Sequence, residues 1–263
     1  MGKQKHKMIV AGPLVYEAIY PMPLPRDPSA VRRGKQELTK PAQERLNLKN
    51  QWQKLECLMA ANFRRGDLVL TLTFTDEWLP ESRTEAIRRF KMFVSLLRER
   101  RAPFMKPTYY LYNVEHRHYK EKPVYTPIEK AKQGRWHFHV LLNSTGADYE
   151  DIKACWQYGL FDVKPFRVDR ERNYETLARY WTKEAVDKNG QRRYSGSRGL
   201  KRPEIDTQII DSRKALEPPK GSEVYGNTGE VSTLYGKYQV VKYVYPRLIE
   251  DAPKVRKRKK KHR

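Results

Sequence analysis

No other segment of this chain constrains its fold and function as much as Trp136-His137-Phe138-His139-Val140-Leu141-Leu142. It is largely apolar and lies between Gln133-Gly134 and Asn143-Ser144-Thr145-Gly146, a pattern typical of a β-strand bounded by turns. Because successive side chains of a strand point to opposite faces, His137 and His139 are expected on one face and Phe138 on the other. Two imidazoles so placed can bind one metal ion, although the short motif is also compatible with ordinary half-buried histidines.

A carboxylate is expected close to this histidine pair. Residues 108–117 are rich in aromatic and β-branched residues and predict a second strand, separated from the first by a polar, proline-containing loop. Two strands joined by a loop usually pair antiparallel, which would bring Glu115 to His137 and His139. A His-His-Glu set with open positions suits Mg²⁺ or Mn²⁺, whereas a solvated charge at a strand end is the alternative for Glu115. His116 is expected to face away from Glu115, and His118 to lie beyond the strand.

A tyrosine and a lysine follow on a predicted helix. Residues 174–185 carry apolar side chains at spacings of three and four, which predicts one helix with a buried side. Tyr180 and Lys183 are three residues apart and therefore lie on one face. A phenol can attack a phosphodiester when a metal polarises the phosphate and a cation stabilises the developing charge. The alternative for Tyr180 is an ordinary half-buried aromatic residue.

These motifs, taken together, resemble those of the HUH endonucleases, the rolling-circle replication initiators of small phages and plasmids. His-Phe-His followed about forty residues later by Tyr-x-x-Lys resembles motifs two and three of that family, and residues 68–74 resemble its first motif. The closer resemblance is to single-tyrosine replication-associated proteins of the filamentous-phage gene-two type. It rests on four features within residues 68–203: Glu115, Trp156-Gln157-Tyr158-Gly159, Tyr180-Trp181-Thr182-Lys183-Glu184 and the basic segment 193–203. Tyr174 lies six residues from Tyr180, so the two-tyrosine pattern Tyr-x-x-x-Tyr is absent.

The resemblance implies a site- and strand-specific DNA endonuclease and strand transferase that nicks and rejoins origin DNA. It implies that Glu115, His137 and His139 hold Mg²⁺ or Mn²⁺, that Tyr180 forms a 5′-phosphotyrosine, and that Lys183 stabilises the phosphate or positions the strand. A mobilisation relaxase or a single-strand transposase would share this chemistry. A non-catalytic single-stranded nucleic-acid-binding module is the alternative of another class, and it would need stacking aromatics on the open face of the sheet.

Composition points to a polyanionic partner. The chain carries 54 Lys and Arg against 31 Asp and Glu, a formal net charge of +23, which favours nucleic acid. Single-stranded or hairpin origin DNA is the expected substrate, and the expected contacts are Arg135, Arg193, Arg198, Lys201 and Arg202. No apolar run approaches the roughly 20 residues of a membrane span, and no signal core is recognised, so an intracellular location is expected. The family resemblance implies the cytoplasm of a bacterial host. The sequence has no phosphate-loop motif, so host helicase and DNA polymerase are expected partners.

The fold class predicted from the order of elements is α+β, with an antiparallel sheet in the split β-α-β order of ferredoxin-like folds. Strands are expected at 68–75, 109–115, 136–143 and 160–166, and helices at 36–64, 83–101, 149–158 and 174–185. The predicted domains are a basic, proline-rich arm over 1–35 with one short strand near 14–19, an endonuclease domain over 36–190, a basic loop and extension over 191–252, and a disordered polybasic tail over 253–263. The same order of elements also fits an RNA-recognition module.

Overall fold

The computed structural model describes residues 3–22, 41–117, 134–146, 148–167, 174–183, 193–210, 215–233 and 236–244. Two compact units make up the chain: Asn62–Leu200 forms one, and Met1–Ala61 together with Lys201–Arg263 forms the other. We call the first the central unit and the second the terminal unit. The predicted tail at 253–263, the loop with His118, and residue Glu184 lie outside the described residues.

A five-stranded antiparallel sheet forms the central unit, in the order β6-β3-β5-β4-β7. The strands are β3 (Leu68–Phe74), β4 (Tyr110–Arg117), β5 (Arg135–Leu142), β6 (Gly159–Pro165) and β7 (Ser195–Gly196). The predicted α+β class is confirmed. β3 and β5 lie side by side, β4 flanks β5, and β6 occupies an edge, as the position of Pro165 predicted.

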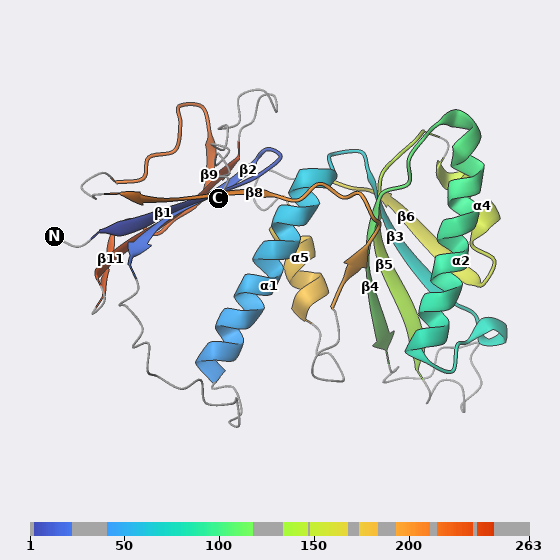
Figure 1. Ribbon diagram of the computed structural model, residues 1–263. Coiled ribbons are helices and arrows are strands. Elements are labelled where there is room, and N and C mark those ends of the chain that lie inside the picture. The colour runs from blue at the N-terminus through green and yellow to red at the C-terminus, as the bar shows by residue number, and fades with distance from the viewer. Residues whose placement is uncertain are drawn as a thin grey trace, which may run out of the picture. The chain divides into compact units, whose positions relative to one another are not determined.

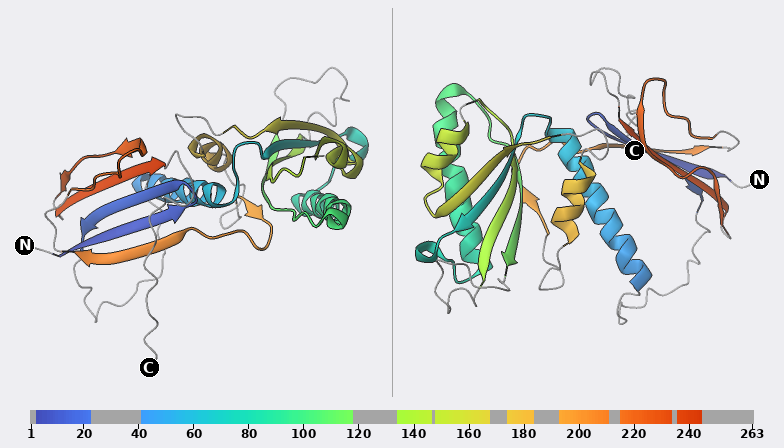
Figure 2. Two further views of the ribbon diagram at one scale, coloured as in Figure 1. Left: turned by 90° about the horizontal axis from the view of Figure 1, so that it is seen from above. Right: turned by 180° about the vertical axis from the view of Figure 1, so that it is seen from behind.

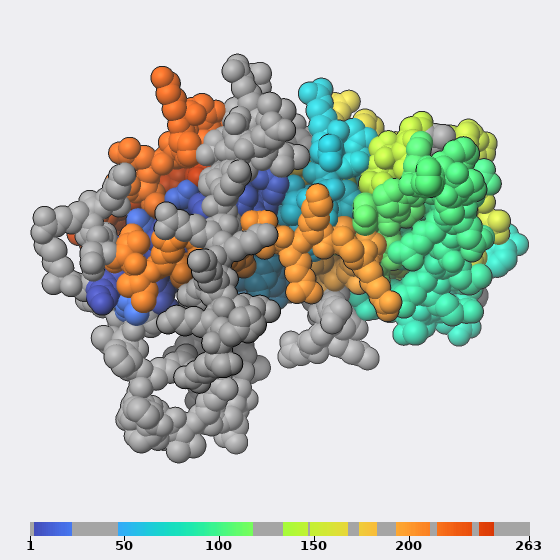
Figure 3. Space-filling model, turned by 45° about the horizontal axis from the view of Figure 1, so that its top comes forward, coloured from blue at the N-terminus to red at the C-terminus, as the bar shows by residue number. Residues whose placement is uncertain are grey.

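One face of this sheet is covered by two helices, α2 (Arg83–Arg101) and α4 (Asp148–Cys155) (Figures 1 and 2). The apolar residues of β3 alternate, so Leu70, Leu72 and Phe74 all point into this core and are fully buried. Phe138 of β5 stacks on Phe90 of α2, with ring centroids 4.7 Å apart and an interplanar angle of 8°. The outer side of α2, green in Figure 3, forms part of the surface. Short 3-10 turns, η1 (Asp76–Trp78) and η2 (Ala102–Phe104), flank α2.

The opposite face of the sheet is covered by α5 (Glu175–Lys183). Its buried side presents Ala178 and Trp181, and Tyr174, which directly precedes the helix, is buried on the same side at a spacing of four from Ala178. The amide of Asn113 in β4 donates a hydrogen bond to the backbone carbonyl of Trp181 at 3.0 Å, and both residues are buried. This contact fixes the helix against the strand that also carries Glu115.

The terminal unit contains a six-stranded sheet that the sequence analysis did not predict. Its path runs β10-β11-β2-β1-β8, with β9 also paired to β11. The strands are β1 (Gln4–Ala11), β2 (Leu14–Pro21), β8 (Glu204–Ile210), β9 (Glu223–Asn227), β10 (Val231–Thr233) and β11 (Gly236–Val244). The expected irregular arm is therefore a hairpin over 4–21, and only its strand near 14–19 was predicted. The hairpin gains partners more than 180 residues further along the chain, a pairing that no local pattern reveals.

A long helix, α1 (Pro41–Asn62), packs on this second sheet, in the range where a helix was predicted. Glu56 is 1% exposed and accepts hydrogen bonds from the Tyr16 hydroxyl and the Lys242 ammonium group. Gly12 has a φ of +58°, and a Cβ there would collide with the carbonyl oxygen of Ala60. Within the described part of the chain, no helix is both long enough and apolar enough to cross a bilayer.

We expect Asn113→Ala to loosen α5 without unfolding the central unit. The substitution leaves the buried Trp181 carbonyl without its side-chain donor, which costs on the order of 1–3 kcal/mol, or roughly tenfold in local opening. Hydrogen–deuterium exchange measured by mass spectrometry should show faster exchange in peptides spanning α5, with peptides from α2 as the internal control. Equal exchange of α5 in both proteins would contradict the assigned role of Asn113.

Candidate active site

The two histidines of β5 and the carboxylate of β4 share the sheet face that α5 covers. Glu115 is the register partner of His137, and Asn113 is the partner of His139. The Nε2 atom of His139 lies 3.1 Å from Oε2 of Glu115. The side chains of both residues are largely buried, 12% and 7% exposed. His116 points to the other face, where its ring lies 4.4 Å from that of Trp136, as the alternation of the strand requires.

The first motif strand orients His137. Thr73 of β3 is the register partner of His137, and its Oγ1 lies 2.9 Å from the imidazole Nδ1. Burial lowers the pKa of His137 to about 4, and the positive charge of Arg117 acts in the same direction. The imidazole is therefore neutral near pH 7, which is the form that ligates metals. The hydroxyl contact at Nδ1 is of the kind that fixes the orientation of a ligand imidazole.

Tyr180 reaches this face from α5. Its hydroxyl lies 3.5 Å from Nε2 of His139, and the two rings meet edge to face at a centroid distance of 5.4 Å. Tyr180 remains accessible to solvent, since the residue is 39% exposed. The arrangement therefore places a phenol next to two imidazoles and a carboxylate, with access from solvent.

Arg117 joins the phenol to the carboxylate, and sequence analysis missed it. Its guanidinium donates one hydrogen bond to the Tyr180 hydroxyl at 2.6 Å, and its Nε donates another to Oε1 of Glu115. The signal that could have revealed it is its position two residues after Glu115, because side chains two apart on a strand share a face. The site thus contains a cation in direct contact with the phenol oxygen.

The residues expected to bind DNA fall into different settings. Arg198, Lys201 and Arg202 are exposed, whereas Arg193 donates to the carbonyl oxygen of Thr182 at the end of α5. Lys183 is the last residue of α5, and its side chain lies outside what the structure describes.

Arg135, which is also expected to contact DNA, lies at the start of β5. Its side chain is largely buried and donates to the carbonyl oxygen of Phe74, at 2.8 Å, and to the carboxylate of Asp76. These bonds tie the start of β5 to the end of β3. The local sequence does not show this burial, because it is set by contacts with residues about sixty positions earlier.

A divalent cation fits this site by donor chemistry. Among the described residues, no three His, Cys, Asp or Glu side chains converge as a metal centre in their present positions. Two imidazoles and a carboxylate on one face are nevertheless a donor set that Mg²⁺ and Mn²⁺ accept. The neutral form of His137 and its contact with Thr73 are consistent with such a role.

Comparison with known families gives a match over the middle of the chain. The family model described as "Replication-associated protein ORF2/G2P" matches residues 67–185. This range contains β3, β4, β5 and α5, and hence Glu115, both histidines and Tyr180; it ends before the basic segment 193–203. Over these residues the chain is similar to replication-associated proteins of this type, in agreement with the resemblance read from its motifs. No curated protein and no solved structure gave a match.

Proposed function

We propose that this chain initiates rolling-circle replication of a phage, plasmid or mobile element by nicking and rejoining one strand of its origin DNA. The observation that carries the proposal is the Tyr180 hydroxyl, 3.5 Å from His139 on the face that also bears Glu115. All three residues lie within the range similar to replication-associated proteins. A nucleophile on a helix that covers a His-His-Glu face is what strand transfer through a tyrosine requires.

The reaction begins when the phenol oxygen of Tyr180 attacks the scissile phosphorus. A Tyr–O–P bond forms and the P–O3′ bond breaks, leaving a 5′-phosphotyrosine and a strand that ends in a 3′-hydroxyl. The phenol loses one proton and the departing O3′ gains one, so the step needs no other reactant. Because the phosphotyrosine is also a phosphodiester, a later attack by a 3′-hydroxyl restores DNA without a nucleotide cofactor.

Arg117 would assist the attack directly. Its guanidinium donates to the phenol oxygen, so it stabilises the phenolate form relative to the phenol. The same group bonds Glu115, which holds it in position and keeps it from swinging away from the nucleophile. Lys183, three residues after Tyr180, would bring a second cation to the phosphate or the strand.

Glu115, His137 and His139 would hold the Mg²⁺ or Mn²⁺ ion. Bound there, the ion would polarise the scissile phosphate and offset the charge that develops on it. Thr73 would keep the His137 ring oriented through its contact with Nδ1. The fit rests on the donor set, two imidazoles and a carboxylate on one face of the sheet.

The DNA would be held mostly through phosphate contacts. Single-stranded or hairpin DNA suits the site, since the target phosphate must reach the face beneath α5, and exposed Arg198, Lys201 and Arg202 are the contacts proposed here. In the cytoplasm of a bacterial host, DNA polymerase would extend the exposed 3′-hydroxyl while host helicase separates the strands. A relaxase or transposase would use the same residues. A non-catalytic binding module is disfavoured because Thr71, Thr73, His137 and His139 occupy the central face where stacking aromatics would be needed.

Tyr180→Phe is expected to abolish covalent capture of DNA and to leave binding unchanged. Removing the hydroxyl removes the nucleophile and little else, because the ring remains. Purified protein and Mn²⁺ are mixed with pooled single strands tiling the DNA that encodes the chain, and adducts are resolved by denaturing electrophoresis. Tyr194→Phe and Tyr174→Phe are the matched controls and should keep the adduct. An adduct formed by the Tyr180 variant would show that another tyrosine is the nucleophile.

Arg117→Ala is expected to slow adduct formation by about 10- to 100-fold, in line with the loss of one donor at a developing oxyanion. Arg117→Lys should recover part of the rate, and free guanidinium ions added to the alanine variant should recover more. Arg179→Ala removes an exposed guanidinium of the same helix that pairs with Glu175 and should change nothing. A purely structural Arg117 would show lowered thermal stability and no chemical rescue.

Removing the imidazoles should abolish metal binding as well as chemistry. We expect calorimetric titration with MnCl₂, without DNA, to show one site in the wild type and none in His137→Gln with His139→Gln. His116→Gln, on the other face of β4, is the control and should bind as the wild type does. Equal Mn²⁺ affinity in all three proteins would contradict a metal site on this face.

A further inference from the structure

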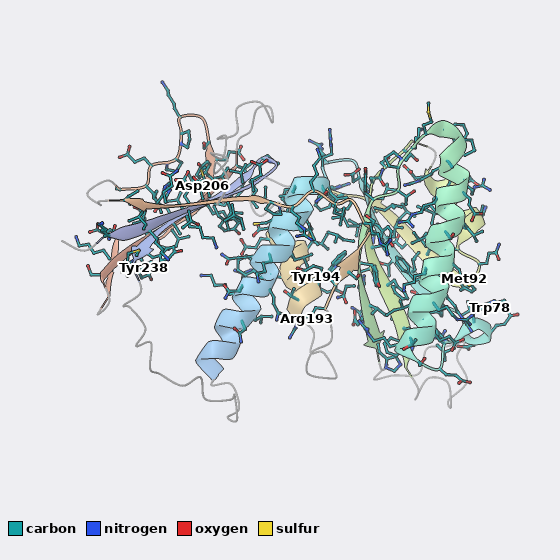
Figure 4. The ribbon with its side chains drawn as sticks, viewed as in Figure 1. Trp78, Met92, Arg193, Tyr194, Asp206 and Tyr238 are labelled. Carbon is teal, nitrogen blue, oxygen red and sulfur yellow. The ribbon has the colours of Figure 1, made fainter. Side chains whose placement is uncertain are left out.

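In strands β1, β2 and β8, the carboxylates and the lysines lie on opposite faces of the terminal sheet. The register pairs Met8 of β1 with Glu17 of β2 and Asp206 of β8, and pairs Val10 with Glu204. All three carboxylates of strands β1, β2, β8 and β11 therefore lie on one face. Lys5 and Lys7 occupy odd-numbered positions of β1, which alternate with Met8 and Val10, and therefore lie on the other face. Lys242 lies on that face too, because its register partner is Tyr16. Figure 4 shows labelled Asp206 and Tyr238 on opposite sides of the sheet.

The lysines of this second face differ in how they are neutralised. Lys242 is bonded to the buried carboxylate of Glu56 on α1. No carboxylate of the described residues forms an ion pair with Lys5 or Lys7, and both side chains are partly exposed. Two positive charges are therefore presented on a face to which β1, β2, β8 and β11 bring no carboxylate. Glu223 of β9 lies on the same face, but at the end away from Lys5, as the partner of Val244.

Aromatic and aliphatic side chains stand beside these lysines. Lys5 pairs with Tyr20 on β2 and with Ile209 on β8. Because Ile19 pairs with Gln239, Tyr238 of β11 occupies the position next to Tyr20. A row of Ile209, Lys5, Tyr20 and Tyr238 thus crosses four strands; Ile209 is 59% exposed, and both tyrosines are partly exposed. We call this row, with Lys7, the lysine–tyrosine face.

Helix α1 contacts the other end of the same face. Glu56 meets Tyr16 and Lys242 there, and Ala60 lies against Gly12 at the turn of the hairpin. From these contacts the N-terminal turns of α1 lead away from the sheet (Figure 1). The helix therefore does not cover the row that begins at Lys5.

We propose that the lysine–tyrosine face binds single-stranded DNA. Ammonium groups attract phosphates, and exposed rings on a sheet offer stacking surfaces to bases. A duplex hides the faces of its bases, so this mixture of amines and rings suits an unpaired strand better than a double helix. The choice of DNA as the polyanion rests on the proposed function. The face would add affinity for the strand while leaving the chemistry at Tyr180 unchanged, because it contains none of the site residues.

The test measures the binding of fluorescent oligothymidylate by polarisation at several salt concentrations. An oligomer of about 20 nucleotides exceeds the roughly 4–16 that one such platform covers. Lys5→Gln with Lys7→Gln should weaken binding and reduce the magnitude of the slope of log K against log salt by about 1.4, since each phosphate contact on a single strand contributes about 0.7. Tyr20→Leu with Tyr238→Leu should weaken binding about tenfold or more, from lost stacking, and leave the slope unchanged.

Lys237→Gln is the matched control, for two reasons. Lys237 is paired with Glu230, and it lies with Gln239 on the face opposite to the lysine–tyrosine face. It should behave as the wild type. Equal slopes and affinities in the control and the double lysine variant would overturn the proposal. So would a double variant that loses binding to phosphatidylserine vesicles while it keeps its affinity for DNA. Adduct formation is measured in parallel at saturating DNA: if wild-type protein forms none while the lysine variant still loses affinity, the nicking function fails and this binding face stands.

Discussion

The alternation of side chains along β5 is the constraint on which the rest of the central unit depends. Phe138 must enter the core against Phe90, and this requirement commits His137 and His139 to the opposite face. A slip of one residue in register would bury two imidazoles in an apolar core and expose a phenylalanine, at a large cost in free energy. The packing that stabilises the sheet therefore also orients the polar site, and neither can change without the other.

The two strands that flank β5 each contribute to the same site. Thr73 from β3 contacts one imidazole, and Glu115 from β4 contacts the other. Asn113 then joins β4 to α5, so the strand that carries the carboxylate also holds the helix that carries the phenol. Since Asn113 and Glu115 are two residues apart, both lie on one face, and the distance between Tyr180 and the imidazoles is set by a short chain of hydrogen bonds.

The sequence revealed the central unit well because its signals are local. Period-two alternation marked the four main strands, and helical spacing marked α2 and α5. Glu115 could be placed beside the histidines because adjacent strands joined by a loop pair antiparallel. Arg117 was missed although it obeys the same alternation, since an arginine at a strand end reads as a solvated charge until its partners are known. The burial of Arg135 was not visible in the sequence, because it depends on contacts with Phe74 and Asp76, far away along the chain.

The terminal unit escaped prediction because its information is non-local. β1 pairs with β8, and β2 pairs with β11, so strands from the two ends of the chain complete one another. Each strand alone is mixed in polarity, and the sheet becomes apparent only when strands from the two ends of the chain are paired. In β1, β2 and β8 the lysines and the carboxylates lie on opposite faces, so they do not attract one another as cross-strand neighbours on one face would. Lys5 and Lys7 therefore leave positive charge on their face, and this charge suits the polyanionic partner proposed for it.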